Sequence, residues 1–337
     1  MPGNLPRYFK TGIYLVMLKT GSLVATILSP IIAPIVKVMA TTGAGTRLCM
    51  KLGCLPVPVH FYQPIPDIKE LEQAKVWDRR SDLAGIDFNI DRQLELLGHL
   101  GENYGSECMW PAKPTGEAGN FYTENQSFSF GCAAATHCII RRHQPARVIE
   151  IGSGNSSLII SAALERNGID NARGYDYTII DPYPKGQLQH VKTPHQVIDK
   201  KVQAIDTQTF TALESGDILF IDSSHCVRIG GDVNFLFLEV LPRLKPGVLV
   251  HIHDIPLPDE YPKVYVTNPR FRVFWTEAYL LQAFLACNDH FEVMLAMSYI
   301  MREYPDRFQQ AFGGCDPTKH RLSSSSFWIR RKQKTPS

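Results

Sequence analysis

The chain has 337 residues, with 35 basic and 33 acidic side chains and a formal net charge of +2. That length suits one large domain with extensions or two smaller domains. The composition is ordinary for a folded protein, and its balanced charge gives no indication of nucleic-acid binding, so we predict none. The eight cysteines include no C-x-x-C pair, which predicts free thiols in a reducing, cytoplasmic compartment.

Residues 1–60 form a basic, apolar N-terminal segment, and no acidic residue occurs among the first 66. An uncharged run lies between Lys19 and Lys37. It is shorter than the roughly 20 apolar residues of a spanning helix, and we expect Pro30 and Pro34 to interrupt it. Three interpretations stay open: peripheral contact with the inner face of the membrane, which basic flanks and an apolar centre favour, an internal packing or oligomer element, and a spanning or signal sequence.

Residues 61–130 begin with a proline-punctuated connector and continue as a mostly helical segment. Apolar positions three and four apart within 90–100 predict a helix there. We expect this region to form a lid or the acceptor side of a site. Asn125, Gln126 and Ser127 lie just before the next helix, and both a structural and a functional role are open for them.

Helical and extended stretches alternate from residue 131 to residue 331, which predicts a doubly wound, mostly parallel α/β sheet. The predicted strands cover residues 147–151, 175–181, 201–204, 217–222, 247–252, 291–296 and 326–330. The predicted helices cover residues 132–142, 157–167, 210–214, 233–244 and 274–287. The last two strands follow the last helix and predict an antiparallel, hairpin-like edge.

Two of these strands end in clusters of polar side chains. One is followed by Asp222 and His225, and the next by His253 and Asp254. Because a single helix-length segment separates the strands, we expect both clusters at the same edge of the sheet, where such sheets bind ligands. Together they can hold a divalent ion and leave one base over. His251, one step further inside the strand, is predicted to be structural.

A glycine turn, Gly152-Ser153-Gly154, joins the first strand to its helix, and Asp181 ends the second strand. The glycines let a ligand approach the backbone closely, and a carboxylate at Asp181 can accept hydrogen bonds from ribose hydroxyls. A dinucleotide fingerprint requires a third glycine where Ser157 stands, which counts against a nicotinamide cofactor. The alternative is a plain tight turn.

With Glu150 two residues before Gly152, the turn resembles the E/D-x-G-x-G motif of class I S-adenosylmethionine-dependent methyltransferases, and residues 131–331 are similar to that family in element order. The resemblance implies a seven-stranded Rossmann-like sheet and S-adenosylmethionine as the cofactor. It places Glu150, Gly152, Ser153, Gly154 and Asp181 in cofactor binding, with Asp181 at the ribose.

The D-x-x-H of Asp222 and His225 resembles that of the metal-dependent sugar O-methyltransferases of the mycinamicin type and of methyltransferases associated with polysaccharide genes. This resemblance implies Asp222 and Asp254 as metal ligands and His225 as the general base. His253 replaces the first acid of the usual pair and stands as a third ligand. An imidazole shifts the preference from Mg²⁺ toward Mn²⁺, Fe²⁺ or Zn²⁺, or leaves a site without metal in which His253 works beside His225.

The sequence thus predicts metal-assisted O-methylation of a saccharide or related hydroxyl acceptor, in polysaccharide biosynthesis. Two other functions stay open. One is a non-catalytic scaffold with a nucleotide-binding fold in a polysaccharide-assembly complex, and the other is an NAD-dependent oxidoreductase. No oligomeric state follows from the sequence.

Overall fold

The computed structural model describes residues 12–116, 119–125, 127–171, 174–184, 186–191, 193, 196–269, 272–313 and 324–333, with the backbone alone for 12–21. The chain divides into two compact units. The first, here called the N-terminal unit, comprises residues 1–78 and 262–274. The second, called the sheet unit, comprises residues 79–261 and 275–337. Gln126 lies outside the described residues.

The N-terminal unit is helical and has a long first helix. Its elements are α1 (Gly12–Thr42), α2 (Thr46–Lys51), α3 (Ile68–Gln73), η2 (Val76–Asp78) and α9 (Lys263–Thr267). The expected interruption at Pro30 and Pro34 is wrong, because both prolines lie inside α1. Pro30 cannot donate to the carbonyl of Thr26, but the hydroxyl of Ser29 donates to that carbonyl at 2.8 Å. The side chain thus replaces a backbone donor that the proline removes.

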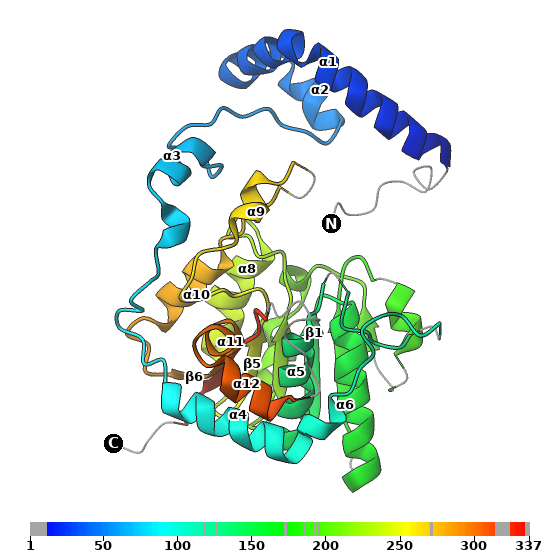
Figure 1. The fold of residues 1–337 in the computed structure, drawn as a ribbon, viewed down its shortest axis with the longest axis vertical. Helices are drawn as coiled ribbons and strands as arrows, with labels where there is room; N and C mark the ends of the chain where they lie inside the picture. Colours follow the sequence, from blue (N-terminus) through cyan, green and yellow to red (C-terminus); the bar gives the residue numbers. More distant parts are fainter. Residues whose placement is uncertain are drawn as a thin grey trace. The chain divides into compact units, whose positions relative to one another are not determined.

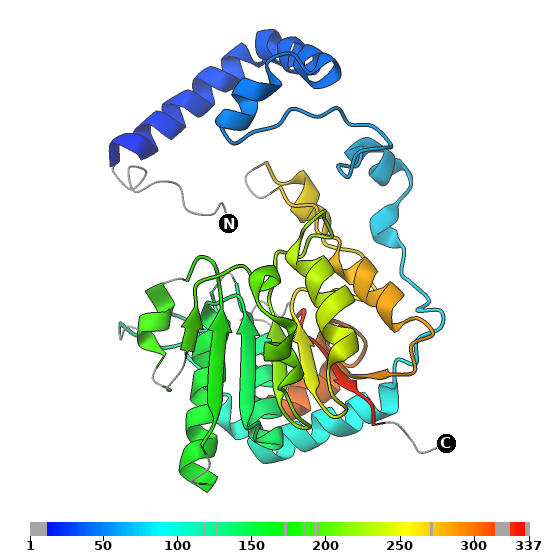
Figure 2. The same ribbon diagram turned by 180° about the vertical axis from the view of Figure 1, so that it is seen from behind.

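The sheet unit contains one seven-stranded sheet with the order β3-β2-β1-β4-β5-β7-β6 (Figure 2). Its strands are β1 (Arg147–Ile151), β2 (Asp176–Ile180), β3 (Gln196–Ile198), β4 (Ile218–Ile221), β5 (Leu249–Ile252), β6 (Phe291–Ala296) and β7 (Phe327–Arg331). The first five strands are parallel, and β7 pairs antiparallel with both β5 and β6. The predicted doubly wound, mostly parallel sheet is confirmed.

Helices cover both faces of this sheet (Figures 1 and 2). One layer packs together α4 (Ile90–Tyr104), α5 (Phe130–His143), α6 (Asn155–Asn171), α11 (Met297–Glu303) and α12 (Pro305–Ala311). The other comprises α7 (Thr207–Thr211), the continuous turns α8 (Asp232–Phe235), η6 (Leu236–Val240) and η7 (Leu241–Arg243), and α10 (Glu277–Leu285). Short helical turns η3 (Gly105–Glu107), η4 (Gly186–His190) and η5 (Val202–Ala204) complete the unit.

The sheet differs from the sequence prediction at both edges. The third strand is Gln196–Ile198, whereas the predicted stretch 201–204 contains a helical turn. Thr178 of β2 pairs with Gln196, so the register of β2 selects this segment. At the other edge β6 and β7 are antiparallel as expected, but α11 and α12 separate them in the chain and β7 inserts between β5 and β6. They are therefore no hairpin.

Candidate functional site

The carboxyl ends of β1, β2, β4 and β5 meet at one edge of the sheet. The amide of Gly152 donates to Ile180 and that of Asp222 donates to Ile151, at 3.0 and 2.9 Å. The amide of His253 donates to Ile221 at 2.9 Å. These bonds continue the ladders just past the strand ends, so the residues that follow all four strands begin side by side.

Gly152 is required by the packing at this edge. Its φ of 86° lies in the left-handed region that favours glycine. A Cβ at this position would collide with the carbonyl oxygen of Asp222. The glycine therefore lets the β1 turn lie directly against the chain that leaves β4, which brings the two predicted halves of the site together.

The carboxylate of Glu150 is fully buried beneath the glycine turn. It accepts hydrogen bonds from the hydroxyls of Ser156 at 2.6 Å and Ser157 at 2.9 Å, and from Tyr177. Burial raises the pKa of Glu150 to about 7, although these hydroxyls oppose the shift. Ser157, which replaces the third glycine of a dinucleotide fingerprint, thus ties the start of α6 to β1.

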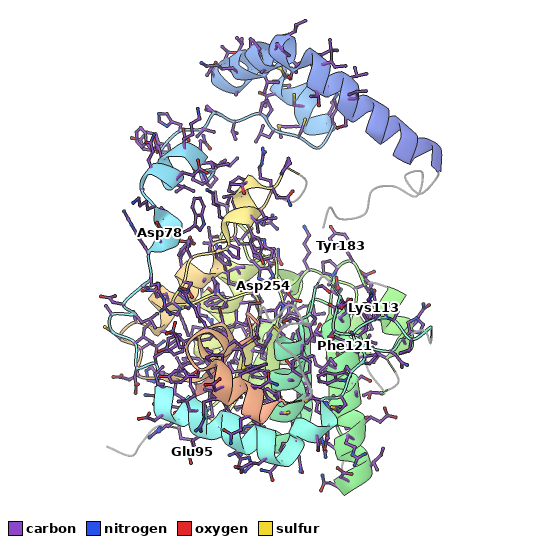
Figure 3. All side chains as sticks on the ribbon, viewed as in Figure 1. Asp78, Glu95, Lys113, Phe121, Tyr183 and Asp254 are labelled. Carbon is purple, nitrogen blue, oxygen red and sulfur yellow. The ribbon has the colours of Figure 1, made fainter. Side chains whose placement is uncertain are left out.

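Asp181 lies directly across from the turn at the end of β2. One of its carboxylate oxygens accepts a hydrogen bond from the hydroxyl of Ser153, and the other accepts one from the amide of Tyr183 at 2.7 Å. Its side chain is therefore held in place from both sides. Tyr183, labelled in Figure 3, is 55% exposed, so this part of the edge reaches solvent.

The loop before α5 is tied to the glycine turn. The side chain of Asn125 donates to the carbonyls of Tyr122 and Phe128, at 2.6 and 2.8 Å, and accepts from the amide of Phe128 at 2.7 Å. Asn155, at the start of α6, donates to the hydroxyl of Ser127 at 2.8 Å. The side chain of Asn125 thus stabilises the conformation of the loop, and Ser127 links the loop to the glycine turn by a hydrogen bond.

The histidine of the D-x-x-H is buried between carboxylates. Nε2 of His225 lies 3.2 Å from Oδ1 of Asp222 and 3.7 Å from Oδ2 of Asp254. Nδ1 lies 2.7 Å from Oε2 of Glu277. The backbone of His225 is left-handed, with φ of 58°, an uncommon conformation for a side-chain-bearing residue that concentrates at functional sites. Both ring nitrogens thus have acidic partners.

From the sequence, Glu277 belongs to a stretch after the fifth strand for which a structural and an acceptor-side role are equally open, and the structure places it against His225. It begins α10, is fully buried, and also accepts a hydrogen bond from the hydroxyl of Ser223 at 3.2 Å. The amides of Thr276 and Glu277 donate to the carbonyl of His225 at 2.8 and 3.2 Å. Its only signal in the sequence is an acid within an otherwise apolar helix.

Charge interactions outweigh burial at two of these groups. Burial lowers the pKa of His225, but Asp222, Glu277 and Asp254 together hold it well above its usual range. Burial raises the pKa of Asp222, but the nearby histidines, His253 first and then His225, lower it to about 2. Asp222 is therefore ionised, and His225 binds a proton tightly.

The two histidines at the end of β5, His251 and His253, lie in different surroundings. His251 is fully buried, stacks on Phe220 with 3.9 Å between ring centroids, and lies 3.2 Å from the hydroxyl of Ser326. Burial holds its pKa well below the usual range, which fits the predicted structural role. His253 lies one step nearer the edge, with Nε2 3.6 Å from Oδ1 of Asp254.

Asp254, labelled in Figure 3, has a left-handed backbone with φ of 56°. Its carboxylate accepts a hydrogen bond from the hydroxyl of Ser325 at 2.7 Å. The structure therefore brings Asp222, His225, His253 and Asp254 together as predicted, and adds Glu277. The metal-binding role of Asp222, His253 and Asp254 and the catalytic role of His225 stay predictions.

The position between Asp222 and Asp254 is occupied by the imidazole of His225. Within the described residues, no group of three or more His, Cys, Asp or Glu side chains is arranged to hold a metal ion. A divalent ion between these carboxylates would need the place of His225 Nε2. In this geometry the residues do not fit a metal ion.

The sequence of this chain matches a known protein family over the region that contains the site. Residues 149–255, from β1 to just after β5, match a family model described as a methyltransferase domain. An uncharacterized protein of Archaeoglobus fulgidus is 32% identical over 182 residues, which cover 52% of this chain and 80% of that protein.

Among solved structures, the SAH-bound methyltransferase PaMTH1 of Podospora anserina is 14% identical, and the match covers 79% of this chain and 95% of that one with a TM-score of 0.38. A TM-score this low supports no conclusion about the present chain. The sequence matches do, since the family model spans the whole edge described above and the archaeal relative is covered over most of its length. The chain therefore belongs to the family described as a methyltransferase domain, and its seven-stranded sheet has the Rossmann-like form.

Proposed function

We propose that this protein transfers the methyl group of S-adenosylmethionine to a hydroxyl oxygen of its acceptor. The observation that carries the proposal is the arrangement of His225, whose Nδ1 lies 2.7 Å from the buried Glu277 while Nε2 faces the strand edge. A hydroxyl must lose its proton to become a good nucleophile, and an oriented imidazole is the usual base for that step.

In the proposed step the acceptor oxygen attacks the sulfonium methyl carbon. The carbon–sulfur bond breaks, neutral S-adenosylhomocysteine leaves, and the hydroxyl proton passes to Nε2 of His225. Glu277 fixes the orientation of the ring and stabilises the imidazolium that forms. Carboxylates raise the pKa of His225, so the neutral ring that can accept the proton becomes populated only at a higher pH than for an ordinary histidine. The glycine turn and Asp181 would hold the cofactor beside it.

The acceptor class is inferred from the D-x-x-H resemblance of Asp222 and His225, which favours a saccharide or a related hydroxyl compound. We place the sheet unit in the cytoplasm, and the free state of the seven described cysteines supports this location. A scaffold without catalysis and an NAD-dependent oxidoreductase would each lack affinity for S-adenosylmethionine.

Metal assistance remains a separate prediction, and no part of the step above depends on it. It is tested by assaying the purified protein after treatment with EDTA and again with Mg²⁺ or Mn²⁺ added back. Turnover that EDTA abolishes and a divalent ion restores would support ligands at Asp222, His253 and Asp254. Full turnover in EDTA would refute the metal and leave the His225 step intact.

The decisive experiment combines binding and product detection. Calorimetry with S-adenosylmethionine and, separately, NAD⁺ tests the cofactor, and labelled methyl transfer to saccharides and lipids extracted from cells lacking the protein tests the acceptor. We expect S-adenosylmethionine binding and an alkali-stable methyl ether in the product. No binding at millimolar S-adenosylmethionine would overturn the proposal, and so would a label found only on nitrogen or carbon.

A further inference from the structure

We propose that α1 crosses a lipid bilayer and anchors the protein to an anionic phospholipid membrane. Residues Ser22–Thr42 of this helix are apolar enough to span a membrane. At 1.5 Å per residue, 21 residues extend about 31 Å, close to the roughly 30 Å of a bilayer's hydrocarbon core. Because α1 continues through both prolines and past Lys37, the helix is longer than the uncharged run between Lys19 and Lys37.

Within the N-terminal unit, no described residues cover the apolar side chains of this segment. None of the 18-residue window that defines the span is buried. Its large apolar residues are between 41% and 66% exposed, and they are Leu23, Val24, Ile27, Leu28, Ile31, Ile32, Ile35, Val36 and Val38. Figure 3 draws side chains of α1 as sticks on the ribbon. A helix of a soluble core would bury such residues, so this one needs an apolar surrounding.

The polar groups of α1 are compatible with that surrounding. The hydroxyl of Thr26 donates to the carbonyl of Ser22 at 2.8 Å, and that of Thr42 donates to Val38 at 2.7 Å. Ser29 donates to the carbonyl that Pro30 leaves without a backbone donor. Since lipid offers no hydrogen-bond partners, hydroxyls that are satisfied within the helix can enter it at low cost.

The chain that follows α1 fits the surface of an anionic bilayer. Between α1 and Asp67 there is no acidic side chain, whereas Arg47 and Lys51 are basic. Lys37 lies inside α1 near the end of the proposed span, from where its long side chain can reach the headgroups. Exposed apolar and aromatic residues accompany these basic residues, including Leu52, Phe61 and Tyr62 at 74%, 79% and 82% exposure. Basic residues attract anionic headgroups, and Tyr and Phe are favourable at the interface.

The test is fractionation of cells that express the full chain, followed by extraction of the membranes with alkaline carbonate. We expect the protein in the membrane pellet both before and after carbonate. The double substitution Ile27→Lys and Ile31→Lys, at two positions that are each 66% exposed, should move it to the soluble fraction. Ile169→Lys with Leu238→Lys is the matched control, since these residues are 74% and 59% exposed on the sheet unit.

Release of the wild-type protein by carbonate would show peripheral contact and overturn the span. A soluble wild-type protein that self-associates would show that α1 packs against a second copy, and a mature chain without residues 1–42 by intact mass would show a signal sequence. Either result also overturns the proposal. S-adenosylmethionine binding by the soluble Ile27→Lys, Ile31→Lys variant is measured separately, so failure of the anchor and failure of methyl transfer are distinguishable.

Discussion

The two sides of the strand edge hold their carboxylates by different means. On the turn side, Glu150 and Asp181 accept hydrogen bonds from neutral hydroxyl groups and an amide. On the histidine side, Asp222 and Glu277 lie against the imidazole of His225. Burial raises the pKa of Glu150 to about 7, and its neutral partners only partly oppose that shift, whereas His253 and His225 lower the pKa of Asp222 to about 2.

This difference separates binding from proton transfer. Neutral partners fix the geometry of a turn without adding charge, as the binding of a cofactor requires. Charged partners around His225 set its affinity for a proton, as a base requires. The edge therefore divides into a turn side that positions a ligand and a histidine side that handles a proton, and four substitutions test the division.

The largest expected effect is that of His225→Asn. Asn tolerates the left-handed backbone at this position but cannot act as a base. We expect kcat to fall about 10²–10⁴-fold, the usual contribution of a general base, while the Kd for S-adenosylmethionine changes little. His290→Asn, at an exposed histidine of the same unit, is the control. A variant with normal cofactor binding and undiminished kcat would remove His225 from catalysis.

Glu150→Gln should change the dependence of stability on pH. A carboxyl whose pKa rises from 4.5 to about 7 on folding contributes stability that is complete below pH 4.5 and is lost as the pH rises to about 7. The loss is about 3 kcal/mol for a shift of this size. Glutamine does not titrate, so the variant should lack this part of the decline.

Urea unfolding at pH 5 and pH 8 measures this effect as the difference between variant and wild type. Glu165→Gln, at an exposed position on α6, should leave the decline unchanged. An equal decline in the Glu150→Gln variant and the wild type would show that Glu150 is ionised at no cost and contradict the neutral character of the turn side.

Asp181→Ala tests cofactor binding on the turn side. Loss of a charged hydrogen-bond acceptor is worth about 1.5–3 kcal/mol, so the Kd for S-adenosylmethionine should rise roughly 10–100-fold. Asp176→Ala is the matched control, because Asp176 begins β2, the strand that Asp181 follows, and its side chain is 83% exposed. Calorimetry that gives the same Kd for both variants would exclude Asp181 from the cofactor site.

Glu277→Gln should have the smallest effect, about tenfold on kcat with unchanged KM. The amide can still accept a hydrogen bond from Nδ1 of His225 but lacks the charge that stabilises the imidazolium. The optimum should also move to lower pH, because the pKa of His225 falls when an adjacent negative charge is removed. Glu239→Gln, at an exposed glutamate, should leave both quantities unchanged. An unshifted pH profile would make Glu277 a purely structural residue.

Much of the sheet could be predicted from sequence because its signals are local. The apolar runs of β4 and β5, with one helix-length segment between them, predicted neighbouring parallel strands, and the structure pairs Ile218 with Leu249. The third strand was missed because Gln196–Ile198 is a short edge segment without a distinctive pattern, chosen by its pairing with β2. Pro30 and Pro34 predicted a break where the structure has a continuous helix. At Pro30 the hydroxyl of Ser29 replaces the lost backbone donor.

The sequence by itself determined the chemical groups at the strand edge, because glycine, histidine and carboxylate each have a chemistry that does not depend on the fold. Only the tertiary structure decided their partners. It placed the buried Glu277 of α10 against His225, more than 50 residues away in the chain, and it used Ser157 to hold Glu150. Hydrogen bonds between distant segments depend on how helices pack on the sheet, and no local pattern encodes that packing.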